Sequence, residues 1–200
     1  MMKNRIQKLY PNTVFEHSAA PNFYIADFTE RTNSRRKVEF YEFLPQTPEG
    51  DKLMDCLTFE NPEEVPVACN IFDDNQFKDS GNKDKSHCEC CLFPTMKAEK
   101  IWTAFVEIKD CKPKNISEYK DKVKAQIIST VNIFKGNGII GITDAVYGII
   151  SFPRKNKVSF NQTIFEDPIE YKKLYRKHKI HFYPSNSIII NSEKKITPAL

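Results

Sequence analysis

The stretches "HCECCLFP" (87–94) and "KIWTAFVEIKD" (100–110) decide the fold, because both are strand-like runs rich in aromatic and β-branched residues. The short polar turn "TMKAEK" separates them, so the segment predicts a β-hairpin. A turn centred near Lys97 and Ala98 would put Glu89 roughly opposite Glu107. Residues opposite one another on antiparallel strands share a face of the sheet. The hairpin therefore predicts two carboxylates on one face.

The segment after the hairpin predicts a helix and then a buried strand. Asn115 followed by Glu118 resembles a capping box, and Gly136 stands where a helix stops. The run "DAVYGIISFPR" (144–154) is continuously apolar, as in a buried strand. Strand, helix and strand in this order predict a mixed β-sheet with a helix on one face. The helix, over about 116–135, is predicted by apolar residues at helical spacing: Tyr119, Val123, Ile127, Val131 and Phe134.

The whole chain is expected to form one α/β domain. Its 200 residues are 40% hydrophobic and 12% aromatic, which is enough for one sizeable core, and no break in composition divides them. The C-terminal helix should begin near Pro168, the hairpin after it should turn around Pro184–Ser187, and "SEKKITPAL" should be a tail. The predicted parts are a core motif region at about 87–152, an N-terminal elaboration over 1–86 with strand candidates at Phe23–Phe28 and Val38–Leu44, and a C-terminal helix and hairpin over 166–192.

Charge and cysteine content describe the expected setting. The net charge of +4 permits a polyanionic partner without requiring one. The charged N-terminus lacks the apolar region of a signal peptide, and no apolar run approaches the length that crosses a bilayer. We therefore expect a cytoplasmic protein with no membrane partner, in which the six cysteines are free thiols.

Glu107 and Lys109 are the first candidates for a functional site. Residues at i and i+2 of a strand face the same way, so both project together from the hairpin, with Glu89 across from them. Two adjacent carboxylates repel unless a cation lies between them, and Mg²⁺ prefers one or two carboxylates plus water and phosphate oxygens. The alternative is an exposed strand face with a screened ion pair that contributes roughly 0–1 kcal/mol.

The order of an acidic residue on one strand ("CEC"), E-x-K on the next ("EIK") and a helix carrying a glutamine ("KAQIISTV") resembles the PD-(D/E)xK, restriction-endonuclease-like superfamily. The resemblance covers roughly residues 87–152 and implies a mixed sheet flanked by helices. It implies Glu89 and Glu107 as ligands of Mg²⁺, with Mn²⁺ as a substitute, Lys109 as the catalytic lysine and Gln126 as the supporting polar residue.

The resemblance also implies partners and one further ligand. Nucleic acid is the implied partner, DNA in preference to RNA, and a homodimer is one arrangement by which such enzymes cut both strands. The family often adds an acidic residue from an earlier helix, for which Glu39 and Glu42 are the candidates. The sequence departs from the family pattern at Glu89, where aspartate is usual, and no proline precedes it.

The cluster "HCECC" raises zinc as a competing cation, because His87, Cys88, Cys90 and Cys91 are all soft ligands. Strand alternation would send Cys88 and Cys90 to one face and Cys91 to the other. Zinc sites usually draw C-x₂₋₄-C pairs from a turn, so zinc is not expected and small buried thiols are favoured.

Basic residues accompanied by aromatic residues occur in "SFPRKNKVSF" and "YKKLYRKHKIHFY". Such clusters can follow phosphates while rings stack on bases, although a solvated helix face would explain the second one equally well. The candidates for contact with nucleic acid are Arg154, Lys155, Lys157, Lys172 and Arg176.

Two functions therefore remain open from the sequence. The first is a Mg²⁺-dependent phosphodiesterase, that is, a nuclease acting on nucleic acid. The second is a catalytically inactive binding or protein-interaction module on the same fold. The direction of the Glu89 and Glu107 carboxylates separates them, because carboxylates on opposite faces exclude the nuclease.

Overall fold

The predicted hairpin lies at the centre of a six-stranded β-sheet. In the computed structural model, β6 (Cys90–Pro94) pairs antiparallel with β7 (Trp102–Ile108), with Cys90 opposite Val106. The hairpin prediction is therefore confirmed. The structure describes residues 2–29, 38–47, 50, 52–73, 76–78, 82–98, 100–141, 143–155, 160–165 and 167–199.

The first sheet has the strand order β1-β5-β6-β7-β8-β9. Neighbouring strands are antiparallel from β1 to β7 and parallel from β7 to β9. The helix α3 (Ile116–Gly136) connects β7 to its parallel neighbour β8, so the predicted helix and buried strand are both confirmed. The other strands of this sheet are β1 (Glu16–Ser18), β5 (Val67–Ile71), β8 (Ala145–Ser151) and β9 (His181–Pro184).

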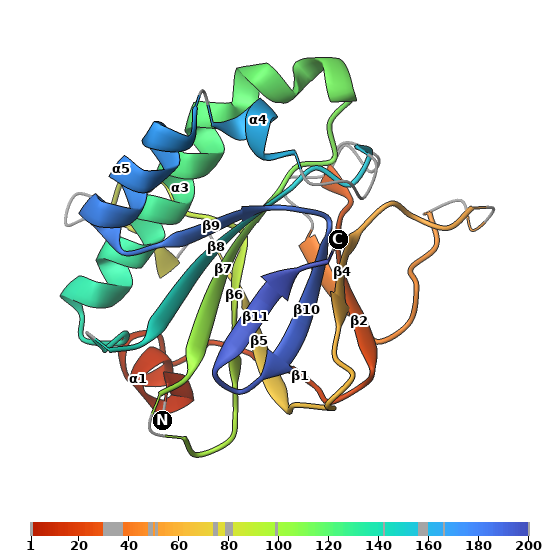
Figure 1. The fold of residues 1–200 in the computed structure, drawn as a ribbon. Helices are drawn as coiled ribbons and strands as arrows, with labels where there is room; N and C mark the ends of the chain where they lie inside the picture. The colour runs from red at the N-terminus through yellow and green to blue at the C-terminus, as the bar shows by residue number, and fades with distance from the viewer. Residues whose placement is uncertain are drawn as a thin grey trace.

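Helices cover one face of the first sheet (Figure 1). Four of the five residues that predicted α3 are buried, and Tyr119 packs partly buried against the same core. Within the described ranges, no helix combines the length and the apolar character that a membrane crossing requires. The other helices are α1 (Met2–Leu9), the 3₁₀ turn η2 (Pro113–Asn115), α4 (Asn161–Ile164) and α5 (Pro168–His178).

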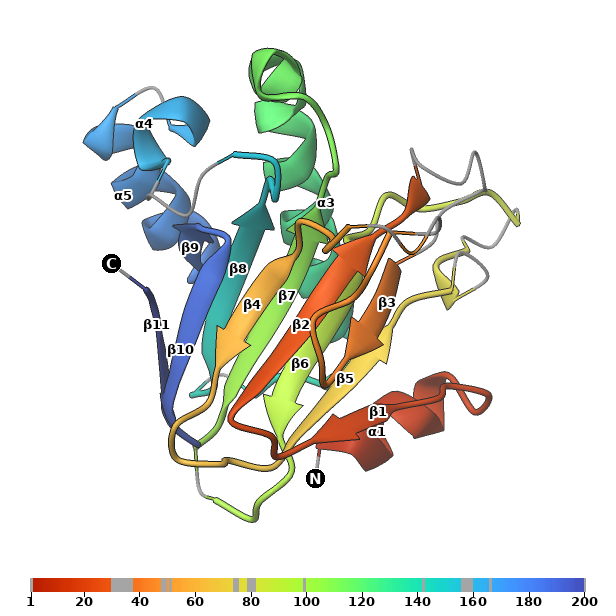
Figure 2. The same cartoon turned by 90° about the vertical axis from the view of Figure 1, so that its right-hand side faces the viewer.

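A second sheet covers the opposite face of the first (Figure 2). Its strand order is β11-β10-β4-β2-β3, and only the β10–β4 pair is parallel. A core between the two sheets includes Phe23, Phe59 and Trp102, all fully buried. The protein is thus one mixed α/β domain with two mixed sheets and helices on the outer face of the first. The strands of the second sheet are β2 (Asn22–Asp27), β3 (Val38–Tyr41), β4 (Leu57–Glu60), β10 (Ser187–Ser192) and β11 (Lys195–Pro198).

The C-terminal prediction is wrong in two respects. The strands on either side of Pro184–Ser187 form no hairpin, because β9 joins the first sheet beside β8 while β10 joins the second beside β4. The residues expected to be a tail form β11, which pairs antiparallel with β10. The chain crosses between sheets at Ser185 and Asn186, and the Asn186 side chain anchors the crossing by hydrogen bonds to Ser151 and Phe152.

The predicted capping box is also wrong. Asn115 belongs to η2 and has helical backbone angles, φ −93° and ψ −4°, and its side chain makes no capping hydrogen bond. A side chain caps a helix from an extended backbone, so the preceding 3₁₀ turn removes this geometry. Asp167 does cap α5, because its extended backbone lets its side chain accept from the Glu170 N–H.

Candidate active site

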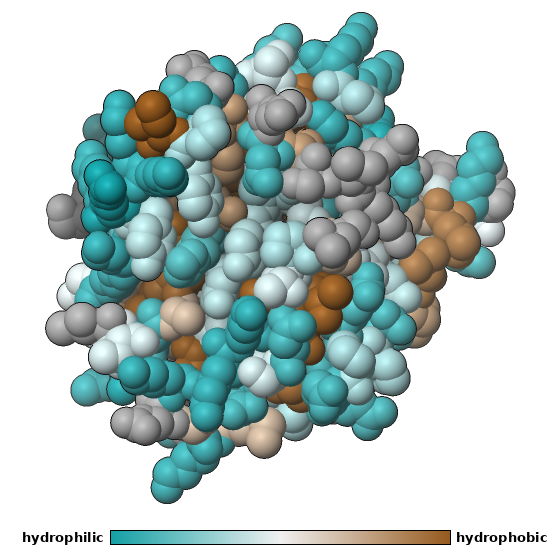
Figure 3. Space-filling model, viewed as in Figure 1, coloured by the Kyte–Doolittle hydropathy of each residue, from teal (hydrophilic) through white to brown (hydrophobic). Residues whose placement is uncertain are grey.

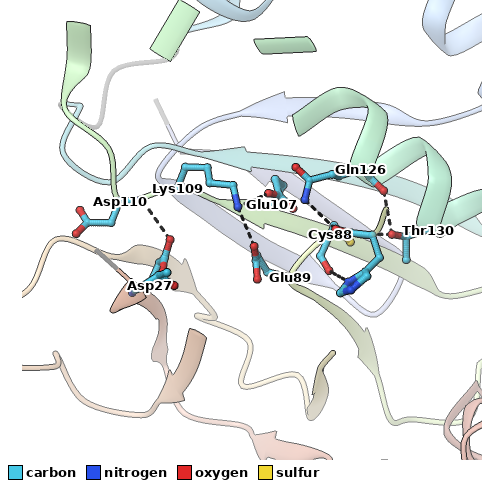
Figure 4. Close-up of polar contacts among 10 residues, drawn as sticks. Asp27, Cys88, Glu89, Glu107, Lys109, Asp110, Gln126 and Thr130 are labelled. Atoms are coloured by element: carbon cyan, nitrogen blue, oxygen red, sulfur yellow. Dashed lines mark hydrogen bonds and ion pairs between the residues drawn. The ribbon is translucent and has the colours of Figure 1, made fainter. Parts of the chain in front are cut away.

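Three charged side chains meet at the open end of the hairpin (Figure 4). The Lys109 Nζ lies 3.0 Å from the Glu89 Oε1 and 2.9 Å from the Glu107 Oε1. Both carboxylates therefore lie on one face and converge on a single ammonium. Glu89 precedes β6, and its N–H donates to the Val106 carbonyl, which holds it across from the end of β7.

These charges are buried, which makes their pairing energetically important. Glu107 is 0% exposed and Glu89 is 4% exposed. Burial lowers the pKa of Lys109, but the attraction of Glu107 and then of Glu89 outweighs burial, so the pKa stays above its ordinary value. The lysine is therefore a fixed cation at neutral pH. Two carboxylates and one ammonium leave this cluster, hereafter the Glu-Glu-Lys cluster, with excess negative charge.

The Glu-Glu-Lys cluster borders an open pocket of about 500 Å³ at the end of β7. Lys109 and Glu89 line it together with Gln126 from α3, and Glu107 contacts Lys109. Ligands of α/β proteins commonly bind beyond the carboxyl ends of parallel strands, and this pocket lies beyond that end of β7. The other lining residues are Asp27, Thr29, Lys85, Ser86, His87, Asp110, Cys111, Tyr119 and Lys122.

Gln126 and Thr130 of α3 hold the segment that carries Glu89. The Gln126 side-chain amide donates to the His87 carbonyl at 2.9 Å, and the Thr130 hydroxyl accepts from the Cys88 N–H at 2.9 Å. Gln126, which the resemblance implied as the supporting polar residue, lines the same pocket as Glu89 and Lys109. Its Oε1 is buried at the pocket and has no hydrogen-bond partner among the described residues.

Asp27 and Asp110 are pocket residues that the sequence analysis missed. The Asp110 N–H donates to the Asp27 Oδ2 at 3.3 Å, which ties the end of β7 to β2 of the second sheet. Asp110 directly follows the E-x-K motif, so its position in the sequence could have identified it as a pocket residue. Asp27 lies within the predicted strand Phe23–Phe28 and ends β2, but only tertiary structure brings it to a site 83 residues further along the chain.

Neither Glu39 nor Glu42 lines this pocket, so neither supplies the additional carboxylate there. Glu39 lies in β3 and accepts a hydrogen bond from the Tyr41 hydroxyl. Glu42 follows β3 and is exposed. Among the described residues of the N-terminal part, Asp27 is the carboxylate that lines the pocket.

The basic residues predicted to contact nucleic acid have different surroundings. Arg154 forms a two-point ion pair with Asp110, with distances of 2.6 and 2.7 Å. Lys155 donates to the Thr163 hydroxyl at 2.7 Å. Lys157 lies outside the described residues. Lys172 and Arg176 are exposed on α5.

The cysteines do not alternate as predicted. Cys88 and Cys91 belong to the core under the helices, whereas Cys90 belongs to the core between the sheets. Glu89 occupies a bend before β6 begins, and this bend breaks the strand alternation. All six cysteines are free thiols, and burial raises the pKa of Cys88 and Cys91.

The Glu-Glu-Lys cluster offers two carboxylates to a cation. Among the described residues, no group of three or more His, Cys, Asp or Glu side chains is arranged to hold a metal ion. Glu89 and Glu107 are the two carboxylates of the cluster that could ligate a hard cation, and water or phosphate oxygens would complete the shell that Mg²⁺ prefers. Comparisons with protein-family models, curated proteins and solved structures found no match for this chain.

Proposed function

We propose that the protein is a Mg²⁺-dependent phosphodiesterase of the restriction-endonuclease-like type, acting on nucleic acid. The observation that carries this proposal is a lysine held between two buried carboxylates at the rim of an open pocket. The order of hairpin, helix and parallel strand agrees with the motif order of the resemblance and supports the proposal.

Glu89 and Glu107 would hold the cation, in the position that the Lys109 ammonium takes between them. A bound Mg²⁺ supplies charge stabilisation at phosphoryl oxygens and lowers the pKa of water. Lys109 has a partly exposed side chain and borders the pocket, so its ammonium can turn toward a phosphate. An ammonium turned toward the phosphate would neutralise the negative charge that develops there.

Other pocket residues suit a phosphate substrate. Lys85 and Lys122 line the same pocket and add positive charge around its mouth. Asp110 is neutralised by Arg154, so it adds little repulsion toward an incoming phosphate. Gln126 holds the His87 carbonyl and thereby orients the segment that carries Glu89.

The second candidate is the inactive binding module. One observation favours it: the Lys109 ammonium already lies within 3.0 Å of both carboxylates, so the cluster is neutralised in part without any metal. In that case Glu89, Glu107 and Lys109 would serve stability alone. The two candidates differ in whether divalent cations bind and whether phosphodiesters are cleaved.

Cleavage of supercoiled plasmid and of single-stranded oligonucleotides tests the proposal, with Mg²⁺, Mn²⁺ or EDTA in parallel reactions. We expect metal-dependent cleavage by the natural chain and a loss of at least about 100-fold in Lys109→Met and Glu107→Gln. Glu118→Gln, which changes an exposed carboxylate on α3, is the matched control and should cleave normally. A folded protein that cleaves neither substrate with either metal would support the binding module instead.

A further inference from the structure

A second cavity, of about 720 Å³, lies between the start of α5 and the edge strand β9. We call it the aromatic pocket and define it by Phe165, Tyr171, Lys172, Phe182, Tyr183 and Pro184. Phe165 and Phe182 are buried in its floor, while Tyr171 and Tyr183 are only partly buried. Besides these rings, one cation, Lys172, and one carboxylate, Asp167, line the cavity, and Asp167 accepts a hydrogen bond from the Glu170 N–H. The rings suit a flat aromatic ligand.

The aromatic pocket lies at the same end of the first sheet as the Glu-Glu-Lys cluster. Glu107 is in register with Ile150 of β8, and Ile150 is in register with Pro184 of β9. The backbone of Pro184 is therefore two strand spacings, or roughly 10 Å, from the backbone of Glu107. The helix α3 lies between the two sites, because its Gln126 lines the first pocket while its Lys124 contacts Ile164 of α4 and Glu170 of α5. A nucleic acid strand that occupies both sites would therefore pass around α3, as part of the roughly 4–16 nucleotides that a single-strand groove holds.

Positive charge follows α5 away from the aromatic pocket. Lys172 lines the cavity, and Arg176 lies one helical turn further along the same side of the helix. Lys173 and Lys177 form a neighbouring pair with the same spacing, and all four side chains are exposed. Figure 3 shows hydrophilic side chains over this side of the molecule. This arrangement resembles single-strand binding grooves, in which cations follow the backbone and rings stack on bases.

We propose that the aromatic pocket receives an unpaired nucleobase, stacked against Tyr171 and Tyr183, while Lys172 and Arg176 contact the adjoining phosphates. The preferred substrate is then single-stranded or locally unpaired nucleic acid. This inference rests on the proposed phosphodiesterase function, because it assigns the substrate class of that site. A duplex keeps its bases stacked and paired, so it cannot fill the pocket without unpairing.

Binding in EDTA tests the inference without any cleavage. The probe is a labelled single-stranded oligonucleotide followed by fluorescence anisotropy, with the same sequence as a duplex and as a strand containing abasic positions. We expect the intact single strand to bind most tightly. Tyr171→Ala and Tyr183→Ala should each weaken its binding by about 5- to 100-fold. Tyr171→Trp, which keeps a stacking ring, should bind within a few-fold of the natural chain.

Tyr24→Ala is the matched control, because Tyr24 is a partly buried tyrosine in β2 of the other sheet. The abasic strand should bind the natural chain and Tyr183→Ala equally weakly, since no base is left to stack. Folded tyrosine variants that bind the intact strand with natural affinity would overturn the inference. So would tight binding of a proline-rich peptide in this cavity together with no preference for single strands.

The two proposals fail in different ways. Tyrosine-dependent binding of single strands without metal-dependent cleavage would contradict the phosphodiesterase and leave the aromatic pocket as a nucleobase site. Metal-dependent cleavage that is indifferent to Tyr171 and Tyr183 would contradict the aromatic pocket alone.

Discussion

Lys109 determines what the two buried carboxylates can do. Its ammonium lies between them and offsets a repulsion that would otherwise raise the free energy of the fold. A divalent cation would compete for the same position, so binding of the metal and placement of the lysine are coupled. The metal carries two positive charges and so attracts the carboxylates more strongly, whereas the lysine is part of the chain and so is always close to them.

Replacing Lys109 by methionine should make folding depend on metal. Without metal, Lys109→Met removes the ammonium that both buried carboxylates contact, and it should lower the free energy of unfolding by about 3–5 kcal/mol. Millimolar Mg²⁺ or Mn²⁺ should then raise its melting temperature more than that of the natural chain. Lys122→Met, at the rim of the same pocket, should behave like the natural chain. Equal metal effects in all three proteins would mean that the cluster holds no cation.

The raised pKa of Lys109 predicts a specific loss of stability at high pH. Folding favours the protonated lysine, so its contribution is complete below the unfolded-state pKa of about 10.4 and declines as the pH rises above that value. The difference in unfolding free energy between the natural chain and Lys109→Met, measured in urea, should therefore shrink between about pH 10 and 12. Burial raises the pKa of Tyr10 and Tyr147 in both proteins, so the difference isolates the lysine. A difference that stays constant over this range would contradict the ion pairing.

At the scale of elements, the loop after β8 and the helix α5 have separate roles. Arg154 joins the β8 loop to the end of β7 through Asp110, which is 3% exposed. The cations of α5 are exposed and lie beside the aromatic pocket. Although the sequence treats all of these basic residues alike, we assign Arg154 to stability and the α5 residues to phosphate binding.

A pair of variants separates these roles. Arg154→Met should destabilise the fold by about 3–5 kcal/mol, because it leaves the Asp110 carboxylate buried without its guanidinium. The double change Lys172→Ala with Arg176→Ala should leave stability within about 1 kcal/mol, since both side chains are exposed. That double variant should instead make the affinity for single strands less dependent on salt. The slope of log affinity against log salt concentration should become shallower by about 0.7 for each phosphate that the protein no longer neutralises. An unchanged slope would return the α5 cations to a solvated helix face.

At the scale of the whole molecule, the two sheets hold the site from opposite sides. The first sheet supplies Glu89, Glu107 and Lys109, and β2 of the second supplies Asp27. The C-terminal segment completes the second sheet, and its Ile196 is fully buried between the layers. The last strand is therefore part of the core.

Ile196→Ala tests this architecture. Truncating a fully buried isoleucine should cost about 2–5 kcal/mol of unfolding free energy, measured by denaturant unfolding. Lys195→Ala, one residue earlier and exposed, should change it by no more than about 0.5 kcal/mol. If the two variants were equally stable, the C-terminal residues would be the tail that their sequence suggests.

Patterns within short stretches of the sequence predicted the elements whose contacts are made between residues close together in the chain. The spacing of Val123, Ile127 and Val131 predicted α3, and the turn near Lys97 predicted a hairpin that brings Glu89 to Glu107. The second sheet could not be predicted in this way, because β10 pairs with β4 across more than a hundred residues. The place of Asp27 and the pairing of Arg154 with Asp110 depend on the same long-range packing.

The most direct test of the central claim is a crystal of the natural chain soaked in millimolar MnCl₂ and measured at a wavelength where manganese scatters anomalously. We predict one strong anomalous peak within about 2.3 Å of a carboxylate oxygen from both Glu89 and Glu107, with the Lys109 Nζ moved out toward the pocket. The absence of a peak between these carboxylates, with Lys109 still in contact with both, would contradict the metal-dependent phosphodiesterase.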